Sequence, residues 1–122
     1  MTAQAPKSSA CFGVEALAID PEAETQKIVE ALRSQLRGMR KRGLVLGLSG
    51  GVDSSVTAAL AVRAVGARNV FTLFMPEDDS DPDSLRLGRQ VAESLGIESV
   101  VENIGPTLVA MGCYDRRDAF IR

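Results

Sequence analysis

The sequence predicts an α/β protein built on a parallel, doubly wound sheet of about three strands. Three observations predict it. Short apolar runs alternate with helical patterns, the connections between them are short, and a glycine-rich turn joins one apolar run directly to a helix. We expect the strands at 44–48, 69–75 and 97–101, joined by right-handed helical crossovers.

Helix signals fill the segments between these strands. Asp20 and Pro21 predict the start of a first helix, with an apolar stripe of Ile28, Leu32, Leu36 and Met39. A second helix is expected at 54–65, a third from Ser80 or Asp81 to Gly96, and a short one at 107–111. Residues 1–19 are predicted to form a flexible tail, ahead of one domain at 20–122.

The glycine-rich turn has the features of a phosphate-binding loop. Gly50 and Gly51 allow a sharp turn and a close approach of backbone to an anion. The helix that follows presents free N–H groups and the positive end of its dipole. The candidate binding residues are Gly47, Leu48, Ser49, Gly50, Gly51, Val52, Asp53, Ser54 and Ser55.

Two common phosphate loops are excluded by the residues present. No lysine follows Gly51, so the Walker pattern is absent, and the glycine spacing does not match the dinucleotide-binding fingerprint. The segment Ser-Gly-Gly-Val-Asp-Ser at 49–54 instead resembles the pyrophosphate loop of the N-type ATP pyrophosphatases, the PP-loop superfamily. That resemblance implies the adenine nucleotide alpha-hydrolase-like, Rossmann-like fold of this superfamily.

Later segments narrow the resemblance to the NAD synthases. They are Phe-Thr-Leu-Phe-Met-Pro at 71–76, Asp-Ser at 79–80, Ser-Leu at 84–85, Leu-Gly-Ile at 95–97 and Asn-Ile-Gly-Pro at 103–106. The likeness covers roughly residues 20–122. It implies an amide-forming ligase that uses ATP and Mg²⁺ to adenylate nicotinic acid adenine dinucleotide, which ammonia then attacks.

The resemblance also implies roles for individual residues. Asp53 would coordinate the Mg²⁺ that bridges the phosphates, and the hydroxyl groups of Ser49, Ser54 and Ser55 would contact phosphate oxygens. No covalent protein nucleophile is required, so no catalytic residue is assigned. A homodimer is implied, and a separate glutaminase that supplies ammonia is a further candidate partner.

Other functions remain open at this point. A second interpretation is another adenylating enzyme of the superfamily, GMP synthase-like or sulfur-transferring, and a third is a non-catalytic nucleotide-binding fragment. Because NAD synthases are longer than 122 residues, we interpret the chain as the N-terminal part of such an enzyme, with an incomplete sheet. By itself it is expected to bind ATP weakly and to form no NAD.

Composition excludes several classes of function. The chain is 45% hydrophobic and 25% charged, and its net charge of −2 gives no basic footprint for nucleic acid. No apolar run approaches the roughly 18–20 residues that span a membrane, which favours a cytoplasmic protein. The absence of histidine excludes Ser–His and Cys–His catalysis within the chain. Cys11 and Cys113 match no metal spacing, and we expect the acidic segment 77–83 to be a solvated helix start rather than a metal site.

Overall fold

A computed structural model of the chain describes Gly13 and residues 18–121. The predicted flexible tail falls almost wholly outside these residues, as does Cys11, so the domain limits stay a prediction. The elements are α1 (Pro21–Gly38), β1 (Leu44–Gly47), α2 (Val52–Val65), the 3-10 turn η2 (Ala67–Asn69), β2 (Val70–Phe74), α3 (Pro82–Leu95), β3 (Glu98–Val101), α4 (Gly105–Ala110) and α5 (Cys113–Ile121).

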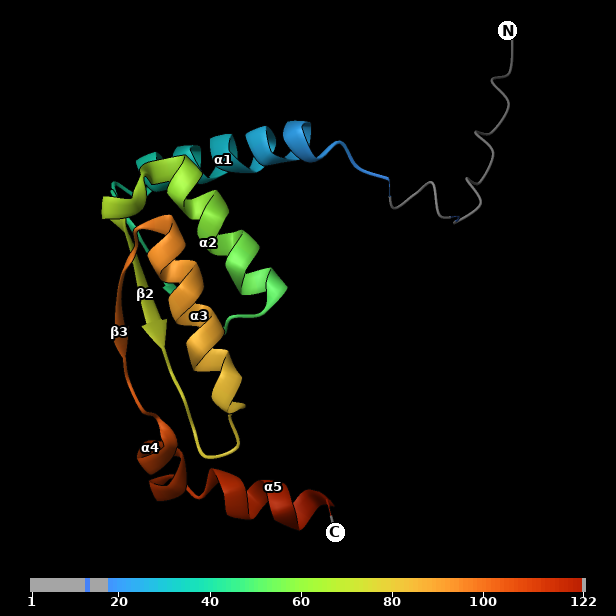
Figure 1. The fold of residues 1–122 in the computed structure, drawn as a ribbon, viewed down its shortest axis with the longest axis vertical. Coiled ribbons are helices and arrows are strands. Elements are labelled where there is room, and N and C mark those ends of the chain that lie inside the picture. Colours follow the sequence, from blue (N-terminus) through green and yellow to red (C-terminus); the bar gives the residue numbers. More distant parts are fainter. Residues whose placement is uncertain (1–12, 14–17, 122) are drawn as a thin grey trace, which may run out of the picture.

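The three strands form a parallel, open sheet in the order β1-β2-β3. Leu44 lies opposite Val70, and Phe71 lies opposite Glu98. Both crossover helices, α2 and α3, cover the same face of the sheet (Figure 1). Right-handed connections require this when each new strand is added on the same side of the one before it. The parallel α/β sheet predicted from the sequence is therefore confirmed.

The core lies between this face of the sheet and the two crossover helices. Alternate residues of β2 point into it: Val70 and Phe74 are buried, and the buried Thr72 hydroxyl donates to the Glu98 carbonyl at 3.3 Å. Ala58, Ala61 and Ala64 are the buried residues of α2. Such small side chains let α2 approach both the strands and α1 closely, which explains why this helix is rich in alanine.

Helix α1 packs on α2, but with a different stripe from the one predicted. Val29 and Leu36 are buried, whereas Ile28 and Met39 are 41% and 60% exposed, so their assignment to the packed face was wrong. The sequence pattern fitted both stripes, because neighbouring apolar positions 28 and 29 each continue a helical repeat to Leu36. Arg33 of α1 also donates to the carbonyls of Arg63 and Ala64, at 2.9 and 2.8 Å, at the end of α2.

Four glycines and one other residue have positive φ among the described residues. The exception is Arg40, with φ of 55°, just beyond the C-cap Met39 of α1. The N–H of Lys41 donates back to the Leu36 carbonyl at 2.9 Å across this turn. Helices commonly end on a left-handed residue of this kind, which is usually glycine because a Cβ is strained there.

Arg40→Gly should therefore stabilise the protein, by about 0.5–1 kcal/mol, because relief of left-handed strain exceeds the added entropy of the unfolded chain. Urea unfolding followed by circular dichroism measures the change. Arg42→Gly is the matched control: Arg42 does not have a positive φ, so its replacement should be neutral or destabilising. Equal effects of the two variants would contradict this explanation of the turn.

Candidate nucleotide-binding site

The glycine-rich loop lies where β1 ends and α2 begins, at the carboxyl edge of the sheet. The N–H of Leu48 still bonds to the Leu73 carbonyl at 3.0 Å, so the sheet ladder continues to the residue before Ser49. Ligands of open α/β sheets bind at this edge. All nine candidate binding residues, 47–55, fall on this strand end, loop and first helical turn, as the sequence predicted.

The start of α2 differs from the starts of α1 and α3 in how its N–H groups are satisfied. The Asp20 carboxylate accepts from the N–H groups of Glu22 and Ala23 in α1, and the Asp81 carboxylate accepts from that of Asp83 in α3. At α2 the N-cap is Gly51, and no side chain caps the helix. Among the described residues, no side chain accepts from its first-turn N–H groups, which lie at the positive end of the helix dipole and so suit an anion.

The serine side chains form a small network within the loop. The hydroxyl groups of Ser49 and Ser54 lie 3.1 Å apart, and Ser54 Oγ also accepts from the Ser49 N–H at 3.3 Å. Ser54 and Ser55 donate to the Gly51 carbonyl at 3.1 and 2.7 Å. Here the serine hydroxyls bond within the loop and hold its turn. Their contacts with phosphate oxygens therefore remain a prediction.

The two glycines of the loop have distinct roles. Gly50 has φ of 80°, and a Cβ there would lie 2.7 Å from the Gly88 nitrogen and 2.7 Å from the Ser84 carbonyl oxygen, both in the backbone of α3. Gly51 has an ordinary φ of −74°, and the nearest atom to a Cβ there would be Ser49 Oγ at 3.5 Å. The fold therefore requires glycine at position 50, whereas a Cβ at position 51 would make only an ordinary contact.

A cavity of about 150 Å³ adjoins the loop. It reaches from the loop to the turn that follows β2 and to the first turns of α3. Its walls are mainly apolar, with polar groups from the loop and the start of α3. The lining residues are Leu48, Ser49, Phe74, Met75, Pro76, Ser80, Asp81, Ser84 and Leu85. An apolar pocket beside the uncapped N–H groups of a helix start has the make-up of a site for a base and its attached phosphates.

Asp53 is exposed in the first turn of α2, next to the uncapped N–H groups. Within 18–121 and at Gly13, no group of three or more Cys, Asp or Glu side chains could hold a metal by itself. A single carboxylate is nevertheless enough for Mg²⁺, which keeps several waters and takes further oxygen ligands from substrate phosphates. Asp53 thus fits its predicted role, although its role is not tested by the geometry.

The acidic segment 77–83 includes the start of α3, as predicted, but it is not simply solvated, because part of it contacts α5. Glu77 accepts from Tyr114, Asp79 pairs with Arg117, Asp81 caps α3 and Asp83 pairs with Arg86 at 3.0 Å. The contacts from α5 were not predicted, because no local pattern connects residues 77–79 with residues 114–117. The pKa of Tyr114 is raised above its ordinary 10.0, chiefly by donation to Glu77 and then by burial, so the phenol stays protonated at neutral pH.

Comparisons with known proteins agree with this geometry. The family model described as NAD synthase matches residues 24–119. The NH(3)-dependent NAD(+) synthetase of Rhizobium meliloti (strain 1021) is 73% identical over 111 residues, which make up 91% of this chain and 33% of that protein. The chain thus spans about a third of the length of such relatives. No helix in the described part of the chain is long and apolar enough to cross a membrane.

Two solved structures share the fold. A glutamine-dependent NAD⁺ synthetase from Acinetobacter baumannii in complex with adenosine diphosphate is 31% identical with a TM-score of 0.72, over 80% of this chain and 19% of that one. An NMN synthetase from Francisella tularensis is 30% identical with a TM-score of 0.73, over 82% of this chain and 41% of that one. Chains similar to this one thus occur both in a protein named an NAD⁺ synthetase and in one named an NMN synthetase.

The loop geometry makes a direct prediction for substitutions at its two glycines. Gly50→Ala should destabilise the protein by about 3 kcal/mol, because it adds left-handed strain and a clash with the α3 backbone. Gly51→Ala should cost only about 0.5–1 kcal/mol, from a poorer helix N-cap. Denaturant unfolding distinguishes the two. Similar losses for both variants would show that the packing of Gly50 on α3 is not as described.

Proposed function

The chain belongs to the NAD synthase family, and we propose that its loop holds the pyrophosphate part of ATP in an amide-forming ligase of that type. The observation that carries the proposal is the uncapped start of α2, at the carboxyl end of β1 and beside an apolar cavity. The ADP complex of the Acinetobacter baumannii relative supports an adenine nucleotide as the ligand of this fold.

In the proposed reaction, a carboxylate oxygen of nicotinic acid adenine dinucleotide attacks the α-phosphorus of ATP, and pyrophosphate leaves. Ammonia then attacks the acyl carbon and AMP leaves, so that the amide of NAD is formed. The residues of this chain would bind and orient the nucleotide: the free N–H groups at the start of α2 would stabilise negative charge on the departing pyrophosphate. Asp53 would hold a Mg²⁺ ion, which when bound supplies positive charge to the phosphates.

Ammonia as the nitrogen source and the dinucleotide as acceptor are proposed from the names of the similar proteins, which include the Rhizobium meliloti enzyme. The NMN synthetase neighbour supports a second candidate, amidation of a mononucleotide acceptor on the same loop. The homodimer, a separate glutaminase and a cytoplasmic location stay predictions. The GMP synthase-like and sulfur-transfer alternatives have no observation in their favour.

The metal assignment is tested with Asp53→Asn. We expect it to weaken Mg²⁺-dependent ATP binding by about tenfold or more, because the variant keeps the shape but loses the charge that a hard cation requires. Isothermal titration calorimetry with and without Mg²⁺ measures the loss. Asp115→Asn is the matched control, since Asp115 also lies in the first turn of a helix, α5. Equal losses in the two variants would overturn the role of Asp53.

The reaction itself is tested by following NAD and pyrophosphate together, from ATP, ammonia and the deamidated dinucleotide. A protein of this family that contains these residues should release one pyrophosphate for each NAD, and less of both with Asp53→Asn. The 122-residue chain assayed beside it should bind ATP and form no NAD. Its cavity of about 150 Å³ is small against the 300–1,000 Å³ typical of ligand pockets. NAD formation by this chain would contradict that expectation, and pyrophosphate release with the mononucleotide acceptor would favour the second candidate.

A further inference from the structure

The turn at 77–80, between β2 and α3, reaches the cavity beside the loop through its last residue, Ser80. The N–H of Glu77 donates to Ser80 Oγ at 2.9 Å, and the N–H of Ser80 donates to the Glu77 carbonyl at 3.0 Å. The N–H of Asp79 donates to the Glu77 carboxylate at 3.2 Å. Ser80 and the following Asp81 both line the cavity, together with Ser49 of the loop. The position of this turn therefore sets where Ser80 and Asp81 stand in the cavity wall.

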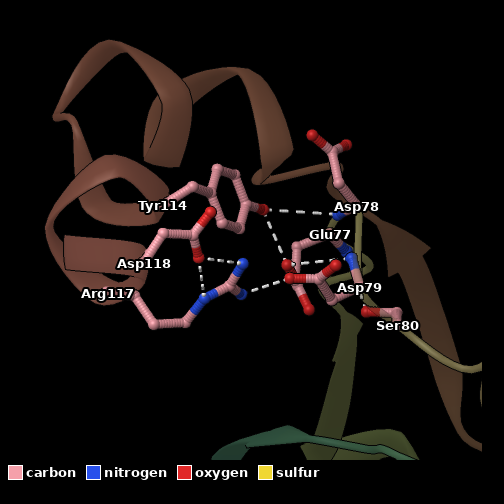
Figure 2. Close-up of polar contacts among 7 residues, drawn as sticks. All are labelled: Glu77, Asp78, Asp79, Ser80, Tyr114, Arg117 and Asp118. Atoms are coloured by element: carbon pink, nitrogen blue, oxygen red, sulfur yellow. Dashed lines mark hydrogen bonds and ion pairs between the residues drawn. The ribbon is translucent and has the colours of Figure 1, made fainter. Parts of the chain in front are cut away.

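Helix α5 holds the same turn from a distance of more than thirty residues along the chain. Tyr114 donates its hydroxyl proton to Glu77 Oε2 at 2.6 Å and accepts from the N–H of Asp78 at 3.3 Å. Arg117 forms an ion pair with Asp79, and its guanidinium carbon lies 5.2 Å from the centre of the Tyr114 ring. Figure 2 shows Glu77 and Asp79 pointing toward these two side chains of α5.

The end of β3 places α5 so that it can make these contacts. The N–H of Ile104 donates to the Pro76 carbonyl at 3.0 Å, directly before the turn. A Cβ at Gly105 would lie 2.8 Å from Asp78 Oδ1, so the start of α4 also contacts the turn. The turn, α4 and α5 thus form one assembly at the carboxyl edge of the sheet, below the strands in Figure 1.

The negative charges of the turn affect how a nucleotide can bind in the cavity. Residues 77–81 carry four carboxylates, and they lie beside a site suited to a polyanion. Free carboxylates near a triphosphate would repel it, more so at low salt. The pairing of Asp79 with Arg117 offsets part of this charge, since Arg117 also pairs with Asp118 at 3.0 Å, and the bond from Tyr114 holds Glu77 toward α5.

We propose that Tyr114 and Arg117 are positioning residues of the nucleotide site. They hold the turn at 77–80 so that Ser80 and Asp81 form the cavity wall, and they keep the carboxylates of Glu77 and Asp79 on the side of α5. The inference rests on the proposed function, because it requires that the cavity and loop bind a nucleotide. It adds two residues, from an element distant in sequence, that act on the nucleotide through the turn.

The test compares Tyr114→Phe and Arg117→Gln with Arg116→Gln in the 122-residue chain. Tyr114→Phe keeps the ring under Arg117 and removes both hydrogen bonds to the turn. Arg116 is the matched control, because it also lies on α5 but donates only to Met111 and Cys113. Two measurements are made on each variant: the Kd for ATP–Mg²⁺, and hydrogen exchange at the N–H groups of Asp78, Asp79 and Ser80.

We expect Tyr114→Phe and Arg117→Gln each to raise the Kd for ATP about fivefold, the size that one hydrogen bond carries, and to speed exchange in the turn. The effect of Arg117→Gln should grow as salt is lowered, and Arg117→Lys, which keeps the charge, should recover most of the affinity. Arg116→Gln should change neither measurement. An unchanged melting temperature separates these effects from a loss of overall stability.

Other outcomes separate the two proposals. Faster exchange in the turn with an unchanged Kd would show that α5 holds the turn without acting on the nucleotide, and would overturn the positioning role alone. Equal changes in Arg116→Gln and Arg117→Gln would overturn it as well. If the unsubstituted chain binds no ATP, both the proposed function and the inference fail. This outcome is recognised from the unsubstituted chain alone, whereas the other outcomes are seen only by comparing variants.

Discussion

The close packing of the loop on α3 is the contact on which the site depends. Gly50 meets the backbone of Ser84 and Gly88, and Gly88 in turn lies under the Phe74 ring, where a Cβ would be 2.7 Å from Cε1. Because Gly50 and Gly88 have no side chains, the loop can pack closely on α3, and α3 can pack closely on β2. Directly after Gly50, the N-cap Gly51 begins α2 without a side-chain cap on its first N–H groups.

The remaining features of the site follow from the same edge of the sheet. All the parallel strands end at this edge. The sheet topology alone therefore brings together the loop after β1, the turn after β2 and the segment after β3. Their contents differ: the first supplies free N–H groups, the second supplies carboxylates and a cavity wall, and the third carries α5 to the second. Each of these three segments is by itself an ordinary connection between elements. They form one site because they lie side by side at the edge of the sheet.

The sequence predicted the parts of this structure that are determined locally. The strands, the caps Asp20 and Asp81 and the loop at 47–55 each depend on residues within a few positions of one another, and the structure confirms these elements. The stripe on α1 failed because two adjacent positions, Ile28 and Val29, fit the same repeat and only the contact with α2 decides between them. The contact of Tyr114 with Glu77 spans 37 residues, and no spacing rule could have indicated it.

Titration of the chain with pyrophosphate, followed by ¹H–¹⁵N NMR, tests whether the free N–H groups of α2 bind an anion. We predict saturable shifts at the N–H signals of Val52, Asp53 and Ser54, with little change at Ala23 of α1 and Asp83 of α3, where carboxylates already accept these protons. Shifts of similar size at all three helix starts, or none at α2, would contradict the account.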